Sequence, residues 1–197
     1  MAILSLNKLL KTELESLDKQ LKTRSRTEVE MINIMSDHII SSGGKRLRPI
    51  TLLLSAYSVN SQLESTIIDS SVVVEFIHAA TLLHDDVVDM SDIRHNIDTA
   101  HTIWGNKGAV LVGDFLYSRA FEIIVEINSP LVYETLAQTT NIIAQGEVMQ
   151  LMNIGNIDIS ENLYMDIIFR KTSILFQASM KIGAILNKGT DKEIQSL

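Results

Sequence analysis

The stretch HAATLLHDDVVD, residues 78–89, decides how the rest of the chain is interpreted. It closes a long apolar run with enough residues for several buried helical turns. At 3.6 residues per turn, Asp85 and Asp89 lie one above the other on a helix, with Asp86 about 100° round the cylinder. His78 faces the same way as Asp85, roughly 10 Å further down the helix. The stretch therefore predicts a cluster of polar groups on a buried helix.

The acidic cluster itself is open to two interpretations. At the C-terminal end of a helix the dipole favours cations, and like charges four residues apart repel. One interpretation is a solvated acidic helix end. The other is a hard cation, Mg²⁺, held by one or two carboxylates and by the phosphates of a substrate.

Composition excludes several classes of protein. The 197 residues are 46% hydrophobic but only 5% aromatic, with two prolines, which predicts one all-α domain over residues 1–197. A net charge of −7 argues against a nucleic-acid partner, and the lack of cysteine excludes thiolate metal sites. Asp69 and Glu75 interrupt the longest apolar run, and the first residues do not resemble a signal peptide. We therefore expect a cytoplasmic protein.

Helical periodicity and turn residues divide the chain into seven or so helices packed around the one that ends in DDVVD. Gly43-Gly44 is expected to cap the second helix, and Pro49 to lie in the first turn of the third. Residues 91–106 are polar and expected to be irregular. The expected helices lie at about 3–22, 28–41, 49–57, 63–89, 107–127, 131–153 and 160–187, and residues 192–197 begin another.

Two basic segments flank the central helix. GGKRLRP, residues 43–49, places three cations near a helix start, where an anion would gain from both amides and side chains. A solvated basic turn is the alternative. Arg94, five residues after Asp89, has the reach to contact phosphates bound by the same metal ions.

Two further polar clusters interrupt later apolar helices. Glu147 and Gln150 share one face, and Gly146 permits close helix approach, although an exposed polar face is equally open. Lys171-Thr172 lies within IIFRKTSILF, where a lysine either extends its amine to water or binds an anion.

Five motifs occur in one order: GGKRLRP, LLHDDVVDMSDIRHN, GNKGAVLVGDFLYSRAF, AQGEVMQL and FRKTSILF. Over residues 35 to 185 the chain thereby resembles the trans-isoprenyl (polyprenyl) diphosphate synthase family. A lone DDxxD is unspecific, whereas five motifs in order are strongly specific. The resemblance implies an antiparallel all-α bundle of the isoprenoid synthase type, which uses Mg²⁺ to condense isopentenyl diphosphate with an allylic diphosphate.

The resemblance also implies roles for individual residues. The predicted catalytic residues are Lys171 and the three metal ligands Asp85, Asp86 and Asp89. Those predicted to bind isopentenyl diphosphate are Lys45, Arg48 and His78, and those predicted to bind the allylic diphosphate are Arg94 and Lys171, with Thr172 and Gln150 beside them. Ionising an allylic C–O bond leaves a diphosphate anion that cations stabilise, so no protein nucleophile is required.

Product length has its own predicted determinants. Ala80 and Thr81 precede Asp85 by five and four residues, on the wall that the growing chain must pass. In this family a bulky aromatic residue there closes the pocket for short products, whereas both residues here are small. We therefore expect a medium- or long-chain product of the hexaprenyl or heptaprenyl type, about C30 or longer, made from a farnesyl-type primer for quinone side chains.

Two features depart from the family pattern. His95 stands where a second arginine is usual, and no second aspartate-rich motif follows Lys171-Thr172 before residue 197. The sequence is therefore expected to be roughly the first two-thirds of a synthase.

Alternative functions are a non-catalytic or regulatory subunit of a heteromeric synthase, a terpene cyclase, or a purely structural helical protein. The intact GGKRLRP and DDVVD motifs argue against a retired subunit, and the second diphosphate site, Lys45 and Arg48, argues against a cyclase. We expect a homodimer, or a heterodimer with a small partner subunit, whose product passes to the membrane.

Overall fold

The computed structural model of the chain describes residue 6, residues 8–42 and residues 44–197, which fall into two compact units. The first unit comprises Met1–Ile50 and Ile68–Asn128, and the second comprises Thr51–Ile67 and Ser129–Leu197. A single domain over residues 1–197 stays a prediction. The all-α prediction is confirmed, because the only strands among the described residues are two pieces of two residues each.

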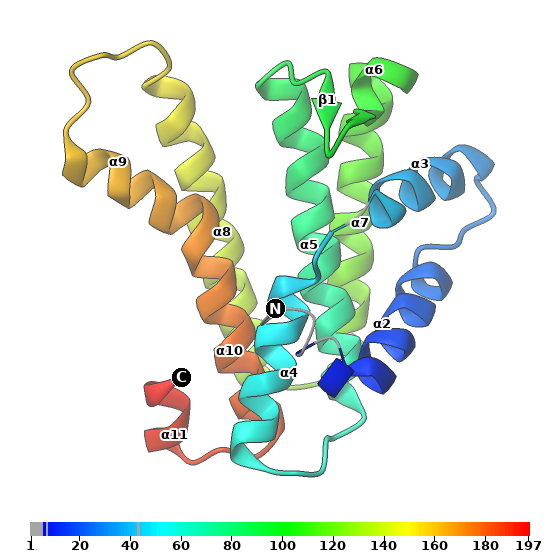
Figure 1. Cartoon of the computed structure of the whole chain (residues 1–197), viewed down its shortest axis with the longest axis vertical. Helices are drawn as coiled ribbons and strands as arrows, with labels where there is room; N and C mark the ends of the chain where they lie inside the picture. Colours follow the sequence, from blue (N-terminus) through cyan, green and yellow to red (C-terminus); the bar gives the residue numbers. More distant parts are fainter. Residues whose placement is uncertain (1–5, 7, 43) are drawn as a thin grey trace. The chain divides into compact units, whose positions relative to one another are not determined.

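Helices carry almost all of the first unit (Figure 1). In chain order its elements are α2 (Lys11–Arg24), α3 (Glu30–Ser41), the first turn of α4 (Leu47–Val59), nearly all of α5 (Thr66–Val88), β1 (Ile93–Arg94), β2 (Ile97–Asp98), α6 (Ala100–Trp104) and α7 (Asn106–Ile127). Pro49 lies in the first turn of α4, as predicted from its fixed φ and missing N–H.

The long apolar run predicted to form the central helix forms α5. Its side chains from Val72 to Val74 and at Phe76 and Ile77 are fully buried, as expected for a helix that is hydrophobic all round. Among the described helices, α5 alone is long and apolar enough to cross a membrane by length and composition, but 67% of its most apolar window is buried. That burial is typical of a core helix.

Residues 91–106, expected to be irregular, instead form a β-hairpin and a short helix. Ile93 pairs with Asp98 and Arg94 with Ile97, leaving a two-residue loop of His95 and Asn96. Both loop residues have positive φ, 51° and 64°, as in the type I′ turns that match the twist of paired strands. The prediction failed because His-Asn lacks the glycine that usually marks such a turn.

The second unit is built on two long helical segments. Its elements are the rest of α4, α8 (Pro130–Met152), α9 (Glu161–Ile168), a π-helical segment (Phe169–Ser173), α10 (Ile174–Leu186) and the short α11 (Asp191–Ser196). α10 packs against α8 and runs antiparallel to it (Figure 1). The helix predicted at 160–187 is thus present, except that its middle turn is π-helical.

The end of α10 is tied to the end of α4 by a buried asparagine. Asn187 Nδ2 donates to the carbonyl oxygens of Ala56 at 2.7 Å and Asn60 at 2.9 Å. Gly183 allows the same close approach, because a Cβ there would collide with the carbonyl oxygen of Leu52. The carbonyl oxygen of Ala56 also accepts from Asn60 N at 3.0 Å, so Asn187 adds a second donor there and a donor to the carbonyl oxygen of Asn60.

Candidate active site

The acidic cluster lies at the C-terminal end of α5, and its three members differ in environment. Asp85 is half-buried and Asp89 is exposed, one helical turn on. Asp86 is only 2% exposed, and its carboxylate accepts three hydrogen bonds from Arg94. The shortest joins Arg94 Nη2 to Asp86 Oδ1 at 2.8 Å. The β-hairpin therefore brings Arg94 back onto the acidic cluster, and its predicted contact with substrate phosphates stays a prediction.

Whether these residues fit Mg²⁺ depends on how the carboxylates are arranged and on the ion pairs they form. In the described part of the chain, no three or more His, Cys, Asp or Glu side chains are arranged to hold a metal ion by themselves. Asp86 forms an ion pair with Arg94, and the three metal ligands Asp85, Asp86 and Asp89 stay a prediction. Mg²⁺ is commonly held by one or two carboxylates together with substrate phosphates and water. The donor set fits an ion shared with a phosphorylated substrate rather than a protein cage.

His78 lies two turns earlier on α5 and is half-buried. Burial, followed by nearby positive charge, lowers the pKa of His78 from 6.5 to about 3. The charged groups responsible are Arg48, Arg94, Arg46 and His95, in decreasing order of effect. The imidazole is therefore neutral at pH 7 and has one N–H to donate.

Arg48 and Lys45 come from the segment that enters α4. Burial lowers the pKa of the Arg48 guanidinium below its usual value, and the negative charge of Glu75 opposes that shift. Arg48 nevertheless stays charged, since arginine does not deprotonate in proteins. Arg48 is the largest of the positive charges that lower the pKa of His78, whereas Lys45 is exposed on the preceding loop.

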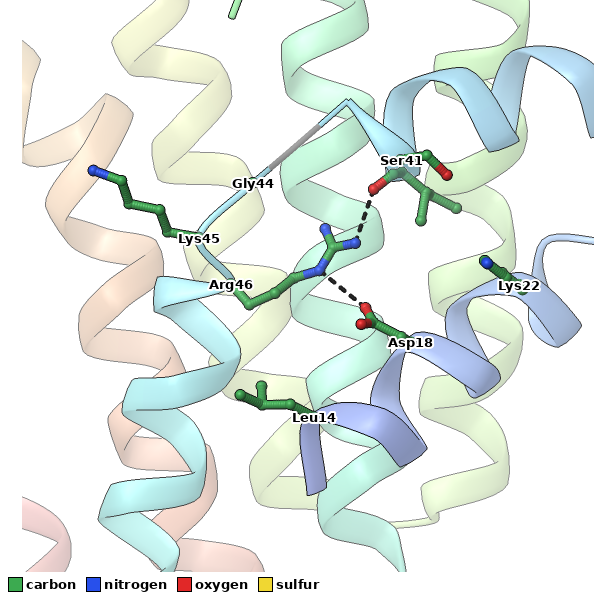
Figure 2. Close-up of a pocket in the computed structure, with 8 residues that line it drawn as sticks. Leu14, Asp18, Lys22, Ser41, Gly44, Lys45 and Arg46 are labelled. Carbon is green, nitrogen blue, oxygen red and sulfur yellow. Dashed lines mark hydrogen bonds and ion pairs between the residues drawn. The ribbon is translucent and has the colours of Figure 1, made fainter. Parts of the chain in front are cut away.

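The predicted glycine cap stays untested, because Gly43 lies outside the described residues. α3 ends at Ser41, and Ser42 follows it as the C-cap. Further along the loop, Arg46 has a left-handed backbone conformation, with φ 51°. Because the backbone turns there, Lys45 extends in the opposite direction from the guanidinium of Arg46 (Figure 2). Residues of the loop, α2 and the end of α3 line a pocket of about 380 Å³: Leu14, Asp18, Lys22, Ile40, Ser41, Gly44, Lys45 and Arg46.

The two predicted wall residues are not equivalent. Ala80 is completely buried, whereas Thr81 is half-buried and its hydroxyl donates to the carbonyl oxygen of His78 at 2.8 Å. Thr81 is thus the position from which a larger side chain has room to project.

The remaining predicted residues come together in the second unit. Gln150, Lys171 and Thr172 line one pocket of about 450 Å³, whose other lining residues are mainly apolar. Lys171 Nζ lies 2.7 Å from Glu147 Oε2. Glu147 and Gln150 are both half-buried, so the alternative of an exposed polar face is wrong.

A π-helical turn and a glycine set this arrangement. Lys171 lies in the π-helical segment, a feature frequent at functional sites. A Cβ at Gly146 would lie 2.8 Å from Arg170 Cβ and 3.0 Å from Lys171 N. The backbones of α8 and the π-helical segment therefore approach as closely as the sequence predicted. Arg170, next to Lys171, is paired with Asp166 and Gln145.

The predicted residues form two groups, one in each unit. Within the first unit the structure brings together the Asp85–Asp89 cluster with Arg94, and places Arg48 and His78 near one another. Within the second it brings together Gln150, Lys171 and Thr172. The individual catalytic and binding roles stay predictions.

Glu75 was missed as a site residue, and Glu147 was named beside Gln150 but without its partner. Glu75, 7% exposed, pairs with Arg46, and the half-buried Glu147 pairs with Lys171. The available signal was an acid inside an apolar helix, since a buried carboxylate requires a cationic partner.

The comparisons with known proteins agree with this geometry. The family model described as Polyprenyl synthetase matches residues 29–197. The chain is 40% identical over 192 residues to the octaprenyl diphosphate synthase of Escherichia coli, covering 98% of this chain and 59% of that protein. It is 38% identical over 171 residues to an all-trans-nonaprenyl-diphosphate synthase (geranyl-diphosphate specific) of Rhodobacter capsulatus, covering 87% of this chain and 53% of that one.

A solved structure supports the fold. The polyprenyl synthase of Caulobacter crescentus, complexed with calcium and isoprenyl diphosphate, matches with a TM-score of 0.94 and 38% identity, over 98% of this chain and 59% of that chain. The predicted isoprenoid synthase fold is confirmed, and the chain spans just over half the length of these relatives. With the family model matching most of its length, the chain belongs to the polyprenyl synthetase family.

Proposed function

We propose that the protein is a trans-prenyltransferase that condenses isopentenyl diphosphate with an allylic diphosphate to make a medium- or long-chain all-trans polyprenyl diphosphate. The observation that carries the proposal is the first unit, where α5 joins an anion-binding group, the cationic Arg48 and the neutral His78, to the acidic cluster paired with Arg94. Each of the two diphosphate substrates needs its own set of positively charged or hydrogen-bonding partners. Relatives named octaprenyl and nonaprenyl diphosphate synthase support the product class.

Isopentenyl diphosphate is assigned to the anion-binding group. Lys45 and Arg48 supply positive charge to its phosphates, and the neutral imidazole of His78 donates one hydrogen bond. Because His78 does not titrate near neutral pH, this hydrogen bond is unchanged between pH 6 and 8. The substrate's diphosphate is thereby held while its double bond stays free to react.

The allylic diphosphate is assigned to Arg94, Lys171, Thr172 and Gln150. Its C–O bond breaks with both electrons leaving on the diphosphate, whose growing charge Arg94 and Lys171 stabilise. The π electrons of the isopentenyl diphosphate double bond then form the new C–C bond to the allylic carbon, and the resulting cation loses a proton to the departing diphosphate. Mg²⁺, when bound by Asp85, Asp86 and Asp89, would supply further positive charge to the leaving diphosphate. Asp86 keeps Arg94 oriented throughout.

Chain length is assigned to the wall beside His78. Replacing Thr81 by Phe fills the space the growing chain passes, so we expect products of Thr81→Phe to be shorter than those of the native chain. Ala80→Phe is predicted to shorten them too, but at a cost in stability, because Ala80 is fully buried. Mass spectrometry of the products measures both, and a Thr81→Phe product of native length would contradict the assignment.

Assembly and location remain part of the proposal. A homodimer, or a heterodimer with a small partner, would cover exposed apolar side chains of α7 such as Leu111 and Phe121. Sedimentation equilibrium measures the assembly. The cytoplasmic location, the farnesyl-type primer, and delivery of product to the membrane for quinone side chains stay predictions.

Two-substrate kinetics test the assignment of the sites. With labelled isopentenyl diphosphate and farnesyl diphosphate, we expect Arg48→Ala to raise the KM for isopentenyl diphosphate and Lys171→Ala to raise the KM for the allylic substrate. Each loses a charge-assisted contact, so about tenfold or more is expected. Label that never enters a longer prenyl diphosphate, or two variants affecting the same substrate, would contradict the proposal.

A further inference from the structure

A buried carboxylate of the first unit has no part in the reaction steps above. Glu75 lies in the apolar run of α5, one turn before His78, with its side chain 9% exposed. Burying an ionised carboxylate is costly unless it is paired and hydrogen-bonded. Glu75 Oε1 accepts a hydrogen bond from Arg46 Nη1 at 2.6 Å, and the Arg46 side chain is itself only 17% exposed.

The guanidinium of Arg46 joins three helices through this contact. Besides Glu75 on α5, its Nη2 donates to the carbonyl oxygen of Ile40 on α3 at 2.8 Å. Its Nε donates to Asp18 Oδ1 on α2 at 3.3 Å (Figure 2). The planar guanidinium fixes several partners at once, which a lysine ammonium does not do in the same geometry.

The backbone of Arg46 shows why such anchoring is needed. Its φ of 51° is uncommon for a long side chain and persists only where the surroundings hold it. Its carbonyl oxygen accepts the hydrogen bond from Ile50 N at 2.9 Å that begins α4. Lys45 precedes this residue and Arg48 follows it in the first turn of the helix. The conformation at position 46 therefore sets the direction of both predicted substrate-binding residues.

The segment before α4 also packs onto the ion pair directly. A Cβ at Gly44 would lie 3.5 Å from Arg46 Nη1 and 3.7 Å from Glu75 Oε1. The Glu75–Arg46 pair thus packs against the backbone from residue 44 to residue 46. Lys45 extends away from the pair (Figure 2).

We propose that Glu75 and Arg46 are positioning residues, which hold the segment 44–46 and the first turn of α4 so that Lys45 and Arg48 meet the diphosphate of isopentenyl diphosphate. The inference rests on the proposed function and adds to it the residues that act through Lys45 and Arg48. A pair that served stability alone would change the unfolding midpoint without distinguishing between the two substrates. A positioning pair changes the affinity for one substrate only.

Calorimetric titration of the whole chain with isopentenyl diphosphate tests this directly. The variants are Glu75→Gln, which keeps the size of the side chain, and Arg46→Gly, which accepts the positive φ without strain but loses the anchor. The matched control is Asp37→Asn, which removes an ion pair with Arg26 elsewhere in the same unit. We expect each variant to weaken binding about tenfold or more, and the control to leave it unchanged.

The double variant gives a readout that general destabilisation would not. Because both residues act through one pair, Glu75→Gln combined with Arg46→Gly is expected to bind no more weakly than the worse single variant. The KM for the allylic substrate is expected to stay within about twofold of native in all variants that turn over.

The outcomes separate the inference from the proposed function. Native affinity in a folded Glu75→Gln or Arg46→Gly variant, or additive losses in the double variant, would overturn the inference. So would a native chain that does not bind isopentenyl diphosphate at all. A native chain that binds it but forms no condensation product would contradict the proposed function while leaving the positioning role supported by the binding data.

Discussion

At the residue scale, His78 makes the stability of the chain depend on pH. Burial and surrounding cations lower its pKa from 6.5 to about 3, so the folded state keeps the imidazole neutral where the unfolded state binds a proton. The free energy of unfolding therefore falls as the pH is lowered from 6.5, by at most about 1.4 kcal/mol per pH unit from this group.

Comparison with His78→Asn isolates this contribution. Between pH 6.5 and 5, above the range where most carboxylates titrate, we expect the stability advantage of native chain over variant to shrink by up to about 2 kcal/mol. Urea unfolding at several pH values measures it. A difference that does not change with pH would mean that His78 titrates alike in both states.

At the same scale, motifs in the sequence predict which residues matter but not the environment of each one. The acidic cluster, Arg94 and the Lys171-Thr172 pair could all be named from motifs. That Asp86 is buried against Arg94, while Asp85 is half-buried and Asp89 exposed, could not, because the difference depends on how a hairpin folds back onto α5.

At the element scale, the crossing of α8 with the π-helical segment depends on Gly146. A Cβ there would lie 2.8 Å from Arg170 Cβ and 3.0 Å from Lys171 N, so Gly146→Ala must push the two segments apart. We expect a loss of about 1–3 kcal/mol in stability and weaker binding of the allylic substrate, because Lys171 moves. Gly108→Ala on α7 is the matched control.

The control is informative because its surroundings have room. A Cβ at Gly108 would meet Met35 and Trp104 atoms only at 3.5 Å or more, so alanine is expected to stabilise α7 by about 0.5–1 kcal/mol. Thermal unfolding distinguishes the two. If Gly146→Ala proved as stable as native, the close crossing would be wrong.

The β-hairpin gives a prediction of the same kind. Asn96 has φ 64°, which asparagine and glycine accept but β-branched residues do not. We expect Asn96→Gly to fold with native stability and Asn96→Val to lose about 1–2 kcal/mol. Urea unfolding compares the two variants, and equal stability would argue against the type I′ turn.

Element boundaries followed from the sequence wherever periodicity was long. α7 and α8 begin within one residue of their predicted starts, because Gly105 and Pro130 mark them. The left-handed conformation of Arg46 could not be predicted, because a propensity rule cannot see that Glu75 holds Arg46 in place.

At the scale of the whole molecule, family membership follows from the fold and the ordered motifs together. The match to the family model runs from residue 29 to residue 197, and the Caulobacter crescentus structure superposes over 98% of the chain. The chain spans 59% of the length of that protein. The condensation activity proposed for this chain therefore has to be measured on the chain itself.

The most direct measurement is the mass spectrum of what the chain makes from farnesyl diphosphate, labelled isopentenyl diphosphate and Mg²⁺. Asp85→Asn removes a predicted metal ligand, and Asp69→Asn, on the same helix but paired with Arg24, is the matched control. The account predicts labelled all-trans prenyl diphosphates of about C30 or longer, abolished by the first substitution and retained with the second. Unreacted isopentenyl diphosphate, or products that Asp85→Asn makes equally well, would contradict it.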